Sequence, residues 1–270
     1  MRAKISHFLL ALVALAFLYP LIFAVATALK PPGETFGSFS LVGSSIRWAN
    51  FADVFTYVPF QRYILNGLFV AAGGTVVVLA ASALSAYAFA ALRWRGRDGI
   101  FLLFLATLMV PQEVLVVPMF LLMQALGWVD SYQSLIFPWA FTAFGTFLLR
   151  QFFRGVPPEL RQAARIDGAG ELRVFLRIML PLARPALGVL AVFTFITYWN
   201  SFLWPLIMIN DVTERGTVPL GLQLFFGQNG SQWHLVMAAS IVSVLPTLLL
   251  LIALQKHLVK GIATAGLAGR

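Results

Sequence analysis

Six apolar stretches, each about 20 residues or longer, decide what this chain can fold into. They cover residues 8–29, 64–92, 100–124, 133–153, 187–209 and 235–255. The hydrocarbon core of a bilayer is about 30 Å thick, and about 20 residues of α-helix are needed to cross it. The sequence therefore predicts an all-α integral membrane protein, a single domain over residues 1–270 with six transmembrane helices.

The composition agrees with a multi-pass protein of the cell membrane and excludes several kinds of site. Hydrophobic residues make up 60% of the chain and charged residues 11%, values typical of membrane proteins. Cysteine is absent, and His7, His234 and His257 have no partner at metal-ligand spacing, so we expect no metal site. No Lys follows a Gly, so the chain has no P-loop. We expect no catalytic residues and no cofactor bound by this chain.

The basic residues orient the predicted helices, because cytoplasmic loops retain Lys and Arg. Fifteen of the 19 lie near the chain ends or around the segments that follow the second and fourth stretches. The other side keeps Lys30, Arg47, Arg62 and Arg215. Both termini and the segment after the fourth stretch are therefore expected in the cytoplasm. This asymmetry explains the net charge of +9 without a nucleic-acid partner.

The first stretch has a second interpretation as a secretory signal. Two basic residues precede an apolar run that reaches Ala26-Thr27-Ala28, a small-residue pattern that resembles a cleavage site. The run is longer than a typical signal core, and Pro20 interrupts it. A retained transmembrane helix is the favoured interpretation.

Glu113 is the only carboxylate inside a predicted span, where it follows Pro111 and Gln112. Counted along a straight helix from Ile100, it lies about 20 Å from the cytoplasmic edge. An ionised group is costly at that depth, so such residues usually face a cavity or a partner. Gln112 and Glu113 are therefore candidates for a solute pathway. The alternative is a protonated acid or a local packing contact.

Residues 154–185 form a polar segment between the fourth and fifth stretches. Pro157-Pro158 and Glu159 predict the start of a short helix, and Gly168 can supply the left-handed turn that ends it. A second, amphipathic segment follows, and we expect Pro181 to stop it. Its apolar side is predicted to hold Leu172, Phe175, Leu176 and Met179, opposite Arg173 and Arg177. The segment thus predicts a short exposed helix held in place by the amphipathic segment that follows it, which we call the bracket.

The spacing within this segment resembles a known signature. Gln162-Ala163-Ala164 is followed after three residues by Gly168, and after nine more by Ile178-Met179-Leu180-Pro181. This is similar to the Glu-Ala-Ala signature of ATP-binding-cassette importer permeases, and over about residues 8–265 the chain resembles their carbohydrate branch, the maltose-type permeases. The resemblance implies a cytoplasmic coupling helix that docks on an ATPase. The coupling residues it implies are Gln162, Ala163, Ala164, Asp167, Gly168, Ile178, Leu180 and Pro181.

Gln162 departs from the family pattern, in which Glu is usual. An amide keeps the hydrogen-bonding reach of the carboxylate but loses its charge, so a charge-assisted hydrogen bond to the ATPase becomes a neutral one. We expect the partner permease or other residues of the loop to hold the dock.

The fifth stretch ends in an aromatic and amide cluster, Trp199, Asn200 and Trp204. Aromatic faces and an adjacent amide suit a neutral sugar, while an interfacial aromatic belt is the alternative. The loops at residues 30–62 and 210–233 are the two sizeable external elements. The second is the candidate contact for a solute-binding protein.

The resemblance implies the partners: two ATPase subunits that bind Mg-ATP, a second homologous permease in a heterodimer, an extracytoplasmic solute-binding protein and membrane lipid. A neutral mono- or oligosaccharide is the expected solute, because no Lys or Arg lies deep in a predicted span. Glycerol 3-phosphate or another sugar-like solute is the alternative. An ion-coupled secondary transporter is an alternative of a different class, although such proteins usually carry several intramembrane ionisable groups.

Overall fold

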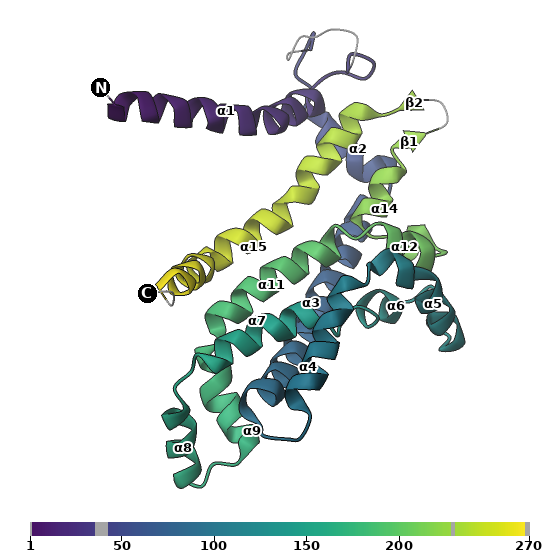
Figure 1. The fold of residues 1–270 in the computed structure, drawn as a ribbon. Helices are drawn as coiled ribbons and strands as arrows, with labels where there is room; N and C mark the ends of the chain where they lie inside the picture. Colours follow the sequence, from purple (N-terminus) through teal and green to yellow (C-terminus); the bar gives the residue numbers. More distant parts are fainter. Residues whose placement is uncertain (1, 36–42, 228–229, 268–270) are drawn as a thin grey trace.

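Three long helices form the frame of the computed structural model, which describes residues 2–35, 43–227 and 230–267. They are α1 (Arg2–Ala28), α3 (Phe60–Ala91) and α15 (Trp233–Leu267) (Figure 1). Each contains a segment long and apolar enough to cross a membrane: Ser6–Ala28, Phe60–Ala91 and Trp233–Gln255. These segments coincide with the first, second and sixth predicted spans.

The third predicted span is wrong as a single straight helix. The structure has α4 (Arg97–Ala106) with a short 3-10 turn η1 (Thr107–Met109), and then α5 (Gln112–Ala125), with a bend of 101° between the two parts. Pro111 has no N–H to continue the helix, and Val110 before it is extended, as residues before proline usually are. The depth of Glu113 counted along a straight helix therefore does not apply.

The fourth and fifth predicted spans are also broken. Residues 133–153 form α6 (Tyr132–Ile136) and α7 (Ala143–Arg154), joined by a link that contains Pro138. The fifth span forms α11 (Arg184–Trp199) and α12 (Leu203–Met208), interrupted at residues 200–202. If Arg97–Met109 with Gln112–Ala125, and Glu171–Leu182 with Arg184–Trp199, each count as one bent span, the number of candidate spans among the described residues rises from three to at most five.

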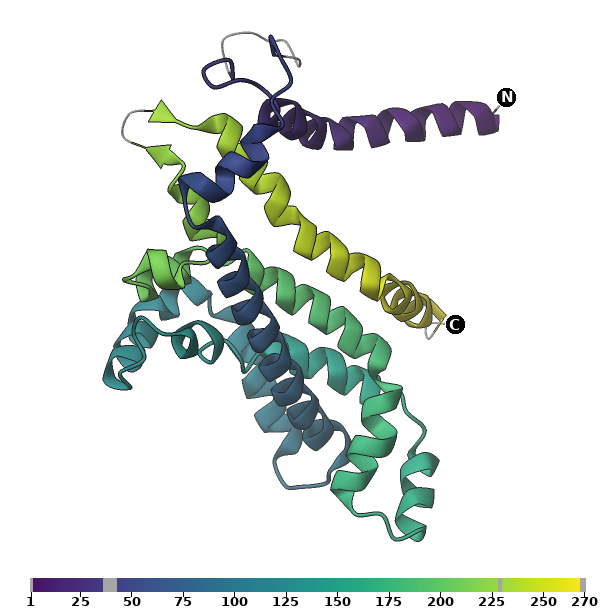
Figure 2. The same ribbon diagram turned by 180° about the vertical axis from the view of Figure 1, so that it is seen from behind.

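The polar segment folds as predicted in its first half. Helix α8 (Pro158–Ile166) begins at Pro158, and Gly168 follows it with φ +77°, the left-handed conformation that glycine adopts readily. No residue of α8 is buried. In both views it lies at one end of the molecule (Figures 1 and 2).

The second half of the segment differs from the prediction in two ways. It runs through α9 (Glu171–Val174), a π-helical turn η2 (Phe175–Met179) and α10 (Leu180–Leu182), and then bends by 76° into α11. The helix ends at Leu182, one residue after Pro181, as predicted, and Pro181 itself sits in the first turn of α10, where its missing N–H is tolerated. The buried side also differs: Phe175 and Met179 are buried, whereas Leu172 and Leu176 are exposed.

Helix α3 lies at the centre of the fold, and small residues form its closest crossing with another helix. A Cβ built on Gly145 of α7 would lie 2.3 Å from the Ser82 hydroxyl of α3, so these two helices cross in close contact. The Ser85 and Thr146 hydroxyls form a 2.7 Å hydrogen bond across the same crossing. Close approach through small residues is how membrane helices pack when lipid offers no hydrophobic drive.

The end of the molecule opposite α8 carries the remaining short elements (Figure 1). They are α2 (Ala49–Tyr57), α13 (Val212–Arg215), α14 (Val218–Gln223), and the antiparallel pair β1 (Phe226–Gly227) and β2 (Gly230–Ser231). Glu214 ties this end to α3: it forms an ion pair with Arg62, and its carbonyl accepts a 2.9 Å hydrogen bond from Asn66.

Helix α1 projects away from the rest of the molecule (Figures 1 and 2). In the most apolar continuous stretch of 18 residues within its span, no residue is buried inside the chain. Its last turn is the exception, since Thr27 and Ala28 are buried. The Ala28 carbonyl accepts a 2.8 Å hydrogen bond from the Asn50 amide of α2. Pro20 lies inside α1 without ending it.

Candidate functional site

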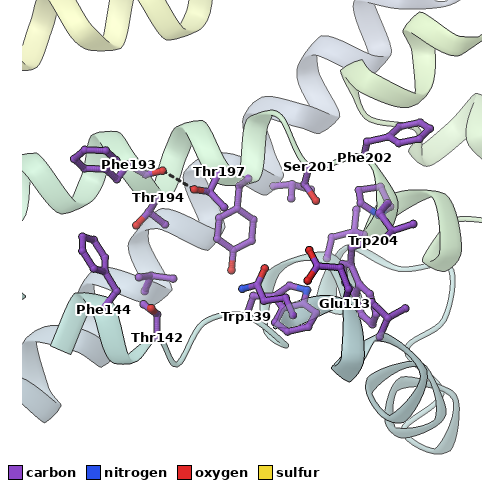
Figure 3. Close-up of a pocket in the computed structure, with 18 of the residues that line it drawn as sticks. Glu113, Trp139, Thr142, Phe144, Phe193, Thr194, Thr197, Ser201, Phe202 and Trp204 are labelled. Carbon is purple, nitrogen blue, oxygen red and sulfur yellow. Dashed lines mark hydrogen bonds between the residues drawn. The ribbon is translucent and has the colours of Figure 1, made fainter. Parts of the chain in front are cut away.

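A cavity of about 470 Å³ opens where the three broken segments meet (Figure 3). It lies between the start of α5, the link from α6 to α7, and the break between α11 and α12, with α3 behind them. Non-helical backbone at membrane depth is tolerated where it is buried in protein or lines a wet cavity. The three helix breaks are therefore tolerated because they line this cavity.

The polar atoms of the cavity belong to hydroxyl groups, one side-chain amide, two indoles and one carboxyl group. Around them stand the apolar residues Val70, Val78, Val116, Leu135, Phe144, Leu190, Phe193, Phe202, Leu203 and Pro205. The polar and mixed side chains are Gln112, Glu113, Trp139, Thr142, Thr194, Thr197, Tyr198, Ser201 and Trp204. A mostly apolar wall with a few placed polar groups is typical of small-molecule sites, which enclose about 300–1,000 Å³.

A glycine on α3 positions the Tyr198 ring. A Cβ added to Gly74 would lie 2.6 Å from two atoms of this ring, so only glycine lets the tyrosine lie against the α3 backbone. The Tyr198 hydroxyl donates a 2.8 Å hydrogen bond to the Ile136 carbonyl at the end of α6. Tyr198 therefore fixes α11 to α3 and to the broken fourth segment at once.

Two indoles hold the opposite wall. The Trp204 Nε1 donates a 2.7 Å hydrogen bond to the Ser134 carbonyl, and its ring meets Trp139 edge to face with centroids 5.3 Å apart. This pairing anchors α12 on α6. Thr197 bonds its own helix, at 2.9 Å from the Phe193 carbonyl (Figure 3).

The structure brings together three of the five residues that the sequence suggested for a pathway. Gln112, Glu113 and Trp204 line the cavity, and the Glu113 carboxylate is exposed there (Figure 3). Trp199 lies elsewhere: it is 3% exposed, and its Nε1 donates a 3.0 Å hydrogen bond to the Ser243 carbonyl of α15. Asn200 is exposed at the break, outside the cavity lining.

Sequence reasoning missed most of the polar lining. The omitted residues are Trp139, Thr142, Thr194, Thr197, Tyr198 and Ser201. One signal was available, since Pro138 in the fourth stretch and Asn200-Ser201 in the fifth are poor helix formers inside apolar runs. They mark the places where the helices stop.

The eight predicted coupling residues divide into two groups. Gln162, Ala163, Asp167 and Gly168 are exposed on α8 and its end. Ala164, Ile178, Leu180 and Pro181 are half-buried, and all but Pro181 pack against the core cluster of Ala86, Leu149, Phe175 and Leu190, among others. One part of the motif thus faces outward, and the other seals the bracket to the spanning helices.

Polar contacts connect α8 to the end of α3. Arg161 donates a 2.6 Å hydrogen bond to the Ala91 carbonyl, and Arg165 forms an ion pair with Glu171. Glu171 also accepts a 2.5 Å hydrogen bond from the Tyr87 hydroxyl of α3. That hydrogen bond, together with Arg165, lowers the pKa of the Glu171 carboxyl. Helix α8 is therefore joined to the end of α3 directly through Arg161 and indirectly through Glu171.

Arg150 provides a second fixed point near the same end. It is 6% exposed and donates hydrogen bonds of 3.0 Å to Asp98 of α4 and 3.2 Å to the Phe89 carbonyl of α3. Its guanidinium also lies 3.8 Å from the centre of the Phe101 ring, a cation–π contact. One side chain of α7 thus holds the ends of α3 and α4.

The chain belongs to the family of binding-protein-dependent transport system inner membrane components, whose model matches residues 81–264. The matched region includes the polar segment and every broken helix. Membership confirms the family indicated by the signature and favours it over the ion-coupled alternative. The family description also places such proteins in the inner membrane.

Individual relatives align over nearly the whole chain. The sn-glycerol-3-phosphate transport system permease protein UgpE of Pectobacterium atrosepticum is 37% identical over 95% of this chain and 94% of its own length. The arabinooligosaccharides transport system permease protein AraQ of Bacillus subtilis is 30% identical over 96% and 93%. A solved bacterial ABC transporter involved in alginate import matches the fold with a TM-score of 0.84 at 23% identity, covering 95% of this chain and 96% of that one.

Proposed function

We propose that the chain is a permease subunit of an ATP-driven importer, in which α8 docks on a separate ATPase and the cavity passes the solute. The observation that carries the proposal is the exposed α8, joined by Arg161 and Glu171 to α3, which also forms the back wall of the cavity. Force applied to α8 would reach the cavity through one continuous helix. Since this chain has no P-loop, two partner ATPase subunits would bind and hydrolyse Mg-ATP.

The remaining partners follow from the same assignment. A second homologous permease would complete the pathway and cover apolar surface such as that of α1, and lipid would cover the rest. A solute-binding protein would contact the end that carries α2, α13 and α14.

The proposed topology has six spans with both termini in the cytoplasm, the broken fourth segment counting as one crossing. Cysteine tagging tests it, because the chain has no native cysteine.

The proposed solute is a neutral mono- or oligosaccharide. Aromatic rings beside hydroxyl and amide groups, as at Tyr198, Trp139 and Gln112, suit the apolar faces and hydroxyls of a sugar. The second candidate is glycerol 3-phosphate, which a 37% identical relative is named for.

Gly168→Pro tests the coupling assignment. Proline fixes φ near −65° and cannot adopt the +77° observed, and it removes the N–H that donates to the Arg165 carbonyl at 3.0 Å. ATP-dependent uptake should fall about tenfold or more, the effect of about 1.4 kcal/mol lost at docking. Gly170→Pro is the matched control, because Gly170 has φ −69° and open space around it.

Two outcomes would contradict the proposal. If Gly168→Pro and Gln162→Glu both left coupling unchanged, α8 would not be the docking element. If uptake survived ATP depletion but stopped with a proton uncoupler, the transporter would be driven by an ion gradient.

A further inference from the structure

A single side chain carries the formal charge that this chain contributes to the cavity. Among the residues that the structure describes, Glu113 is the only carboxylate in the lining, which includes no Lys, Arg or His. It is exposed in the cavity, and no hydrogen bond or ion pair joins it to another described residue of this chain. Clefts lined by one sign of charge concentrate ions of the opposite sign.

Three arginines at the end of the molecule opposite α8 do not offset this charge, because they are already paired with acids. Arg47 lies 2.9 Å from Asp53, Arg215 lies 2.7 Å from Asp130, and Arg62 pairs with Glu214. None of the three lines the cavity.

The position of Glu113 also removes a possible anion-binding site. It lies in the first turn of α5, a helix of 14 residues whose amino end opens on the cavity. A helix amino terminus otherwise favours an anion, through its free N–H groups and the helix dipole. Here the carboxylate supplies the negative charge itself, so a dissolved anion meets repulsion where it would have been attracted.

We infer that Glu113 makes this cavity selective for hydroxylated solutes that are neutral or carry an amine, and that it disfavours phosphate esters and uronates. The inference deepens the proposed function and rests on it for the role of the cavity as a solute pathway. It separates this chain from what its relatives' names suggest, since glycerol 3-phosphate is an anion. Hydroxyl recognition would come from Tyr198, Ser201 and the threonines around them.

The absence of cysteine allows a test that needs neither the solute nor ATP. In the full transporter in native membranes, Ser201→Cys places one thiol on this chain, inside the cavity. A cationic and an anionic methanethiosulfonate, carrying trimethylammonium and sulfonate groups, then react with it, and mass spectrometry of this chain gives the two rates. Thr56→Cys, exposed on α2 away from the cavity, gives the reference ratio.

In the Ser201→Cys protein, the cation should react about tenfold faster than the anion, relative to the Thr56→Cys reference. Adding Glu113→Gln should bring the ratio to the reference value, whereas Glu113→Asp, which keeps the charge, should preserve it. Gln124→Lys is the matched control: it makes the same change of one unit of charge at the far end of α5, outside the lining, and should leave the ratio unaltered.

Three results would overturn the inference: an anion preference in the Ser201→Cys protein, a ratio unchanged by Glu113→Gln, or no reaction with either reagent. Each can occur while uptake remains ATP-dependent and sensitive to Gly168→Pro. Failure of this inference is therefore distinguishable from failure of the proposed function. Where uptake is measured, Glu113→Lys should raise the rate for sn-glycerol 3-phosphate relative to glycerol about tenfold or more.

Discussion

The two ends of α3 serve different regions that are built in opposite ways. At one end, Tyr87 donates a hydrogen bond to Glu171, and the Ala91 carbonyl accepts one from Arg161 of α8. Helix α8 itself has no buried residue. Further along, a Cβ on Gly67 would lie 3.1 Å from the Trp199 ring, and a Cβ on Gly74 would lie 2.6 Å from the Tyr198 ring. Helix α8 is held by a few polar contacts, whereas the residues behind it and the cavity wall are held by close packing. The contrast predicts that removing single polar groups affects α8, and that adding volume affects the cavity region.

The largest difference between the regions should appear on adding one methyl group. Gly74→Ala would place a Cβ 2.6 Å from the Tyr198 ring, and overpacking of this kind costs about 1–3 kcal/mol. The melting temperature of the purified complex should fall, and Tyr198→Ala in the same protein should restore part of it. Gly99→Ala, with open space around it, should cause no loss. Equal effects at both glycines would remove the contrast.

Two tyrosine hydroxyls, one in each region, allow a matched comparison. Tyr87→Phe removes the hydrogen bond to the Glu171 carboxylate, worth about 1.5–3 kcal/mol because the acceptor is charged. Tyr198→Phe removes the one to the Ile136 carbonyl, worth about 0.5–1.5 kcal/mol. Tyr87→Phe should lower solute-stimulated ATP hydrolysis several-fold and leave the apparent affinity for solute unaltered. Tyr198→Phe should change the apparent affinity first. The reverse assignment would contradict the division of labour.

The bracket should also respond to pH through Glu171. Its pKa is lowered from the ordinary value of 4.5, mainly by the Tyr87 hydroxyl and then by Arg165. A lowered folded-state pKa means that the stabilisation is fully present above about pH 4.5 and is lost as the pH falls through the lowered pKa. The stability difference between the wild type and Glu171→Gln should therefore shrink on acidification. A difference that grew would contradict this sign.

The smallest expected effect is at Gln162. The residue is exposed on α8, so Gln162→Glu should not change the stability of the chain. A charge-assisted bond to a basic residue of the ATPase would strengthen docking by about 1 kcal/mol at most, because exposed ion pairs are worth about 0–1 kcal/mol. Uptake should rise at most a few-fold. A large loss would show that the amide makes a contact that a carboxylate cannot.

The same contrast explains how far the sequence could predict the structure. Helix α8, its end at Gly168 and the central place of α3 follow from local signals: proline, glycine and small residues at fixed spacing. The wall of the cavity does not, because Tyr198 becomes a wall residue only when Gly74, more than 120 positions away, lets it approach. Trp199, its neighbour, turns to α15 instead, and no local pattern distinguishes the two aromatic residues.

The failure at the second half of the polar segment has a different origin. The prediction assumed an unbroken α-helical repeat from Leu172 to Met179 and so expected both leucines on the apolar side. The helix has a π-turn at Phe175–Met179, and the core receives Val174 together with the predicted Phe175 and Met179, while both leucines stay exposed. Hydrophobic patterning alone carries no signal for a single wide turn.

That wide turn also bears on the direction of α8. Its bonds run from residue i to i+5, so it holds one residue more than an α-helical turn. The extra residue is accommodated within the turn itself, so the helix keeps its phase on either side. Deleting one residue between Phe175 and Met179 would convert it to an ordinary turn and leave α8 and Glu171 facing nearly the same way. The wide turn thus lets the chain between Gly168 and Ile178 hold one residue more without redirecting α8.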